Sequence, residues 1–138
     1  MVAKRSISVG SAIVALSVAA FLLAACGSSK PSYCSSLASL KSSVKALPTT
    51  NVVTGGTNAL KSAVTKVQND ANAVIGDAKN DFPNETSALQ SSVNNLASSA
   101  KGLASGPSAS AIAQTVSDAS AVSTAVQNFS SATSSKCS

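Results

Sequence analysis

The sequence has 138 residues, with 10 Lys and Arg against 5 Asp and Glu and only 3% aromatic residues. This length fits one domain, and the net charge of +5 is mild. Because Arg5 is the only arginine and Trp and His are absent, the sequence does not indicate a nucleic-acid-binding surface. The lack of His and the few acids also disfavour an enzyme, a metal site or a bound cofactor.

The first 25 residues have the three parts of a secretory signal peptide: a basic start, an apolar run and an end of small residues. Lys4 and Arg5 form the basic start, and the apolar run extends from Ile7 to Leu23. An ordinary export signal is one alternative, although Leu23 stands where signal peptidases favour a small residue. A single membrane-spanning helix is another, since the run is just long enough to span a bilayer.

The run ends in Leu23-Ala24-Ala25-Cys26, which resembles the bacterial lipobox. By that resemblance the Cys26 thiol takes a diacylglyceryl group, and cleavage before Cys26 makes it the new N-terminus. A thiol suits this step because it is a stronger nucleophile than a hydroxyl at neutral pH. Each buried methylene contributes about 0.8 kcal/mol, so a second acyl chain turns marginal binding into stable anchoring. We therefore expect an exported protein held at the outer face of the plasma membrane.

Cys34 and Cys137 remain after Cys26 is lipidated, and an exported pair is expected to form a disulfide. Residues 26–32 precede the pair and form a predicted flexible tether, in which Lys30 either lies near the lipid surface or is only a solvated linker lysine. In the chain-entropy model, closing a loop of about 100 residues contributes ~4–5 kcal/mol, which matters for a thin core. A redox or metal-binding pair is the alternative, but there is no C-x-x-C spacing to support it.

Four later segments carry apolar residues at alternating spacings of four and three, the pattern of a helix stripe. They extend over about Tyr33–Leu47, Thr57–Lys79, Asn84–Ala104 and Ser108–Ala132. The stripe residues are Tyr33, Leu37, Leu40, Val44 and Leu47; Leu60, Val64, Val67, Ala71, Val74 and Ala78; Leu89, Val93, Leu96, Ala100 and Leu103; and Ile112, Val116, Ala119, Val122, Val126 and Phe129. Pro48, Pro83 and Gly106-Pro107 separate the segments.

Short connectors favour an all-α, up-down antiparallel four-helix bundle over residues 33–138. In that topology the first helix starts and the fourth ends at the same end of the bundle. Cys34 and Cys137 stand at those two places, so the disulfide supports the topology. Phe82 is expected to plug one end, and the connector residues Val52 and Val53 to fold back onto the core. A long open coiled coil is the alternative, which the dividing prolines disfavour.

Two stretches, Ser42 to Lys45 and Ser98 to Lys101, match the Ser-x-x-Lys motif of penicillin-recognising enzymes, in which the Lys helps to activate the Ser. The companion motifs Ser-Asp-Asn and Lys-Thr-Gly are missing. A Ser-rich chain with scattered Lys produces such matches by chance. We therefore expect no catalytic residue here.

Asp77 and Asp81 lie one helical turn apart, a spacing at which two carboxylates could bind a cation or exchange protons. The simpler interpretation is a solvated helix end. Lys66 and Asp70 are expected to form a surface ion pair that contributes little.

Lys41 and Lys45 on the first helix and Lys61 and Lys66 on the second are candidates for a weak basic face toward wall polymers or lipid headgroups. The alternative is that these charges only solvate exposed helix faces. A hydrophobic ligand between the helices is not favoured, because small Ala side chains fill a seam closely and few aromatic residues are available to line a pocket.

The chain after Cys26 resembles small exported lipoproteins of actinobacteria, a loose and largely uncharacterised group. Besides the lipobox, the shared features are Tyr33-Cys34, Val52-Val53 followed by a Gly turn into Ala59-Leu60, Phe82-Pro83, and a Cys just before the C-terminus. The resemblance implies membrane attachment and a helical body, and it transfers no catalytic residue. We expect a non-enzymatic structural or adaptor module that binds another envelope protein through a helix face. The alternative is a small binding protein for a lipid or an anionic wall polymer.

Overall fold

The computed structural model describes residues 29–47 and 52–138, and for residues 52–55 only the backbone. Its four helices are α1 (Ser32–Ala46), α2 (Val52–Ala78), α3 (Pro83–Ser105) and α4 (Ala109–Cys137). The predicted signal peptide and Cys26 lie outside the described residues. Within the described part of the chain, none of the helices combines the length and the apolar character that crossing a bilayer requires.

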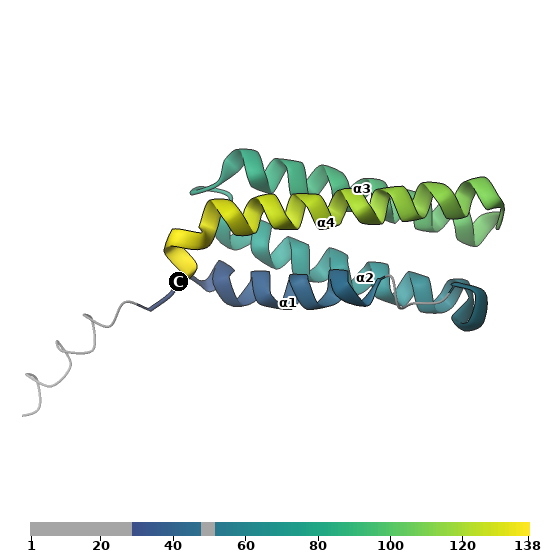
Figure 1. The fold of residues 1–138 in the computed structure, drawn as a ribbon, viewed down its shortest axis with the longest axis horizontal. Coiled ribbons are helices and arrows are strands. Elements are labelled where there is room, and N and C mark those ends of the chain that lie inside the picture. The colour runs from purple at the N-terminus through teal and green to yellow at the C-terminus, as the bar shows by residue number, and fades with distance from the viewer. Residues whose placement is uncertain (1–28, 48–51) are drawn as a thin grey trace, which may run out of the picture.

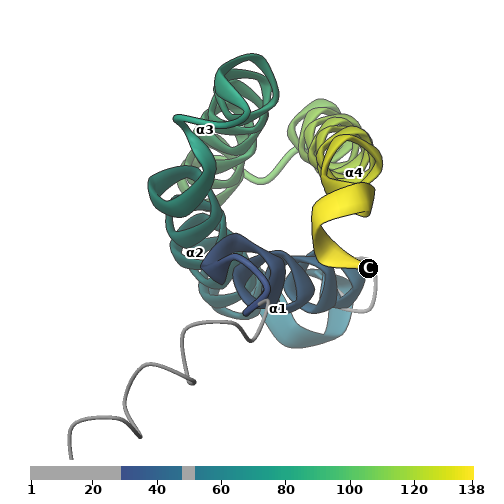
Figure 2. The same cartoon turned by 90° about the vertical axis from the view of Figure 1, so that its left-hand side faces the viewer.

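The four helices form the predicted up-down bundle. Each helix packs against its neighbours in the chain, and α1 also packs against α4, which closes the ring (Figures 1 and 2). No diagonal pair of these described helices comes into close backbone contact. This all-α architecture confirms the bundle topology and excludes the open coiled coil.

Most of the predicted stripe residues form one core. Leu40, Val67, Leu89, Leu96 and Phe129 are fully buried, each with 0% of its surface exposed. Alanines complete the seams; those buried are Ala71, Ala78, Ala97, Ala100 and Ala125. Because Ala has almost no side chain, the helix backbones approach closely along these seams.

The start of α2 differs from the predicted boundary. Helix begins at Val52, not near Thr57, but Gly56 has φ 69° and ψ 179° and interrupts it after one turn. Only Gly adopts this backbone conformation readily, so the predicted Gly turn is present within a longer helical segment. The side chains of Val52 and Val53, expected against the core, lie outside the described residues.

The first residues of α3 and α4 follow local sequence signals for a helix start. Pro83 is the first residue of α3, where its fixed φ suits a helix start. At the start of α4, Ser108 is the N-cap, and its hydroxyl accepts a hydrogen bond from the Ala111 amide at 3.1 Å.

The C-terminal end of α4 was predicted wrongly. The fourth helix was predicted to end at about Ala132, but helix continues through the Ser-rich stretch to Cys137. Thr133 in this stretch is fully buried, and its hydroxyl donates to the Phe129 carbonyl at 2.9 Å. Packing and the covalent bond to α1 therefore override the weak helix propensity of serine.

The helices differ greatly in length. At about 1.5 Å per residue, the 15 residues of α1 span about 22 Å, whereas the 29 residues of α4 span about 43 Å. The α1 helix therefore lies beside only the C-terminal half of α4 (Figure 1). Ile112 and Val116, predicted in the core stripe, are instead 40% and 62% exposed, because α1 ends before it reaches them.

Candidate functional site

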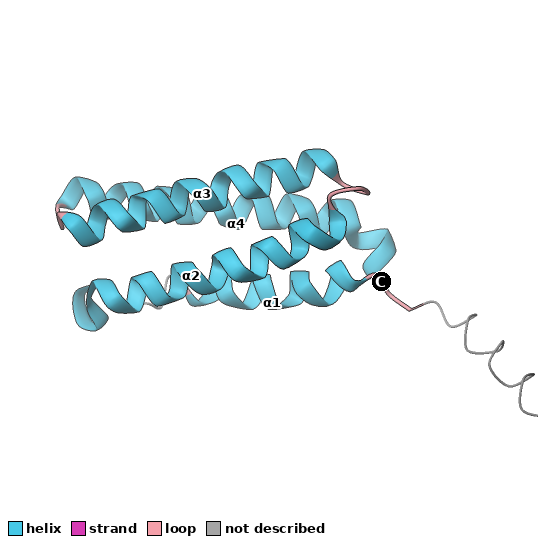
Figure 3. Cartoon of the chain, turned by 180° about the vertical axis from the view of Figure 1, so that it is seen from behind, coloured by secondary structure: helices cyan, strands magenta, loops and turns pink. Residues whose placement is uncertain are grey.

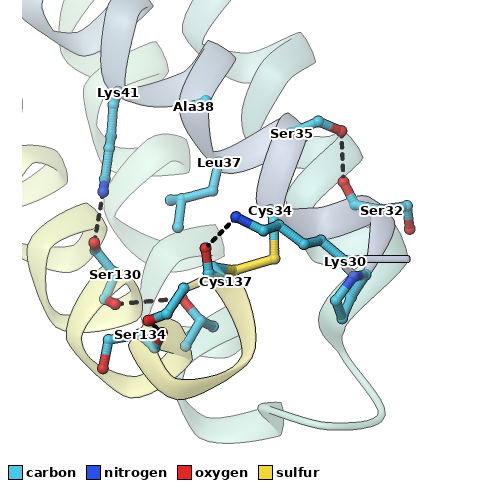
Figure 4. Close-up of a pocket in the computed structure, with 13 residues that line it drawn as sticks. Lys30, Ser32, Cys34, Ser35, Leu37, Ala38, Lys41, Ser130, Ser134 and Cys137 are labelled. Atoms are coloured by element: carbon cyan, nitrogen blue, oxygen red, sulfur yellow. Dashed lines mark hydrogen bonds between the residues drawn. A yellow bond between two sulfur atoms is a disulfide. The ribbon is translucent and has the colours of Figure 1, made fainter. Parts of the chain in front are cut away.

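A disulfide joins Cys34, in the first turn of α1, to Cys137, the last residue of α4 (Figure 4). The Cα atoms of the two cysteines are 5.5 Å apart. Lys30 lies beside the cross-link, and its Nζ donates a hydrogen bond to the Cys137 carbonyl at 3.3 Å. The predicted disulfide is therefore present, and the described chain enters the bundle at the cross-linked end.

Three aromatic rings fill the bundle interior at this end. Tyr33, Phe82 and Phe129 meet edge to face. The ring centroids are 5.7 Å apart for Tyr33 and Phe82, 5.8 Å for Phe82 and Phe129, and 6.4 Å for Tyr33 and Phe129. They come from α1, the turn between α2 and α3, and α4. Edge-to-face rings stabilise beyond their buried area, which confirms that Phe82 plugs an end of the bundle. The rings fill the interior of this end, whereas at its surface a pocket of about 590 Å³ borders the disulfide, with Lys30, Leu37 and Lys41 among its lining residues (Figure 4).

The two Ser-x-x-Lys stretches show no activated serine. The Ser98 hydroxyl donates to the Asn94 carbonyl at 3.0 Å, an ordinary hydrogen bond within the helix. Ser42, Lys45 and Lys101 are exposed, and none of them has a hydrogen bond or ion pair within the described residues. Neither Ser-x-x-Lys stretch therefore joins its hydroxyl to its amine within the described residues, as such catalysis needs.

Three carboxylates, those of Asp70, Asp77 and Asp118, accept hydrogen bonds from serines of neighbouring helices and do not form a cation site. Asp77 accepts a hydrogen bond from the Ser36 hydroxyl of α1 at 3.1 Å, while Asp81 lies in the turn after α2. The carboxylate of Asp118 on α4 accepts from the Ser99 hydroxyl of α3. No cluster of three or more His, Cys, Asp or Glu side chains that could hold a metal is found among residues 29–47 and 56–138.

Asp70 has two partners. It accepts from the buried Ser43 hydroxyl of α1 and forms the predicted ion pair with Lys66, with Nζ and Oδ2 3.1 Å apart. Lys66 is 66% exposed, so this pair is screened by water and contributes little.

The four lysines suggested for a basic face lie on two different sides. Lys41 and Lys45 line a shallow channel between α1 and α4. In this channel Lys41 Nζ donates a hydrogen bond to the Ser130 hydroxyl at 2.6 Å. Lys61 and Lys66 line a depression on α2. The four lysines therefore do not form the single basic face that was considered as a possibility, with solvation as the alternative.

A groove of about 550 Å³ opens where α1 ends. Parts of all four helices line it, and we call it the distal groove because it lies away from the disulfide. The lining residues are Val44, Lys45, Leu47, Leu60, Leu96, Leu103, Ile112, Thr115, Val116, Ala119, Ser120 and Ser123. Eight of these twelve residues are hydrophobic and one is cationic.

The distal groove continues toward the disulfide as a shallower channel between α1 and α4. Val44, Lys45 and Ser123 belong to both, and Lys41 and Ser130 lie further along the channel. Figure 3 shows the bundle from behind, with α1 and α2 as one pair and α3 and α4 as the other. The groove and the channel follow the α1–α4 seam, which is the least extensive of the four helix interfaces.

The periodicity of the apolar residues did not indicate the distal groove. Its apolar lining residues belong to the predicted stripes, and a stripe by itself does not show that its partner helix is absent. A comparison of predicted helix lengths was the signal that could have found it, since the first helix is much shorter than the fourth.

Comparisons with known proteins give no relative for this chain: no protein-family model, no curated protein and no solved structure matches it.

Proposed function

We propose that the chain is a lipid-anchored lipoprotein of the outer face of the plasma membrane, attached through Cys26. Its disulfide-clasped bundle serves as a non-catalytic binding protein for a lipid-type ligand. The leading observation is the distal groove, because an apolar groove with one convergent cation is the usual form of a small-ligand site. Lys30 lies at the disulfide end of the bundle, beside the predicted tether, so a cation at this end is consistent with an orientation in which it faces the membrane.

The first test is the mass of the protein purified from its own membranes. Loss of residues 1–25 with the added mass of a diacylglyceryl group is expected, and reduction of the disulfide should add the mass of two hydrogen atoms. Native mass spectra of the same sample should show a non-covalently bound lipid. An unlipidated chain contradicts the anchor, and a ligand-free spectrum contradicts the binding function.

A second candidate function is contact with another envelope protein through a helix face. The observation in its favour is the exposure of Ile112 and Val116, which lie one turn apart on α4. Two apolar side chains at this spacing can seat a partner helix. Crosslinking in intact membranes, followed by purification of this chain, should recover one protein in stoichiometric amount. Recovery of this chain alone argues against the second candidate.

A further inference from the structure

The distal groove has a floor in the bundle core and a lip at the surface. Leu60, Leu96 and Leu103 line it, although at most 5% of the surface of each is exposed. Ile112 and Val116 form the exposed lip on α4. A ligand in this groove lies against the exposed carbon atoms of the lip, above the leucine floor, so the part of it that lies in the groove must be apolar.

A cation stands at the edge of this apolar surface. Lys45 lines both the distal groove and the channel beside it, is exposed, and has no ion pair or hydrogen bond within the described residues. Among the described residues that line the groove and the channel there is no Asp or Glu. The potential at the rim is therefore positive, which favours an anionic group and disfavours a cationic one.

Three of the five carboxylates bond across other seams. Asp70 and Asp77 on α2 bond to serines of α1, and Asp118 on α4 bonds to Ser99 of α3. Lys41 in the channel is hydrogen-bonded to the Ser130 hydroxyl but has no acidic partner. A ligand anion at Lys45 would thus meet a second cation along the channel and no competing carboxylate.

We propose that the distal groove binds a single-chain anionic amphiphile, with the alkyl chain along Ile112 and Val116 above the buried leucines and the anion at Lys45. This inference rests on the proposed lipid-binding function and names its site and ligand class. The volume of about 550 Å³ lies within the usual range of ligand sites, ~300–1,000 Å³. A fatty carboxylate and a lysophospholipid phosphate share the required chemistry.

The burial of the groove floor and the charge at its rim favour this ligand over a partner helix. A partner helix lays a row of side chains along an open surface, whereas the leucines of this groove are almost fully buried and its exposed apolar residues are Ile112 and Val116. Its single unpaired cation also matches one anionic head group better than the mixed surface of a helix. Capture of a protein at this site is therefore an outcome that would overturn the proposal.

The proposal is tested by photolabelling the complete lipoprotein in phosphatidylcholine vesicles, with palmitic acid that carries a diazirine as the probe. Peptide mapping should place the label on α4 between Ile112 and Ser123. The neutral methyl ester of the probe should label this segment more weakly. Excess palmitate and excess lysophosphatidylglycerol serve as separate competitors, and the stronger one identifies the source of the anion.

Two charge reversals provide a matched pair. Lys45→Glu should reduce labelling of α4 about tenfold or more, because an attraction becomes a repulsion and a loss of 1.4 kcal/mol corresponds to a factor of ten. Lys61→Glu makes the same charge change at an exposed residue that lines the α2–α3 side, and it should leave labelling unchanged. Circular dichroism of both variants verifies that the bundle is folded.

A third variant, Val116→Asp, puts a carboxylate on the lip without disturbing the core, since Val116 is 62% exposed. It should abolish labelling of α4. Uniform labelling along the chain, equal labelling of the two lysine variants, or a crosslinked protein at the groove would overturn the proposal. If native spectra show bound lipid while the label lies elsewhere, the proposed function stands and this site is wrong; if no lipid is bound, the proposed function fails with it.

Discussion

Removal of the Cys34–Cys137 disulfide should destabilise the bundle severely. The cross-linked residues are separated by 103 positions, and in the chain-entropy model a loop of this size contributes about 4.7 kcal/mol at 25 °C. Both cysteines are only partly buried, so replacing them by serine adds little packing loss. A domain of this size is typically stable by about 5–15 kcal/mol, so the expected loss is a large share of the total.

The α1–α4 seam should suffer most, because it is the least extensive helix interface and the disulfide closes it. Urea unfolding followed by circular dichroism measures the effect on the Cys34→Ser/Cys137→Ser double variant. With a urea slope of roughly 1.5 kcal/mol per molar, the midpoint should fall by about 3 M. The reduced wild-type protein should behave like the double variant, and Ser134→Ala, an exposed change at the same end, should behave like the oxidised wild type. A loss below about 1 kcal/mol would refute the reasoning, because core packing alone would then close the bundle.

Three further substitutions test the core, the backbone and the surface by the same unfolding assay. Phe129→Ala should cost about 3–5 kcal/mol, since the ring is fully buried between two other rings; a loss below that of an exposed Ser→Ala change would contradict the packing. Gly56→Ala should cost about 1–3 kcal/mol from backbone strain alone, because φ is 69° and a Cβ atom would meet nothing within 4 Å. Lys66→Ala should cost less than about 0.5 kcal/mol, as its pair with Asp70 is largely exposed; a loss of several kcal/mol would show that the ion pair is not screened.

The topology of the bundle was predictable because two independent features of the chain require it. The spacing of large apolar residues is a local property that sets which face of each helix is buried. The positions of Cys34 and Cys137 then select the arrangement that brings the two ends together. The helix boundary at Ser108 was predictable for a similar reason, since an N-cap is a contact between residues three apart.

The end of α4 and the start of α2 were not predictable from local signals. Serine after Ala132 has a weak helix propensity, which burial of Thr133 and the disulfide overcome. The hydrogen-bond partners of the polar residues were also not predictable from the sequence. Ser43 and Asp70 are 27 positions apart, and no pattern along the chain indicates that the two side chains meet across the α1–α2 seam.

The amino-acid sequence by itself determined four apolar stripes, their breaks at proline and glycine, and a pair of cysteines placed to join two ends. These depend on spacing and on the covalent chemistry of single residues. Only the tertiary structure decided that α1 ends before it can cover Ile112 and Val116, that the four lysines lie on two sides, and that Lys45 borders an apolar groove. The physical reason is that a helix buries its stripe only where a neighbour reaches it, and the lengths and contacts of all four helices together set that reach.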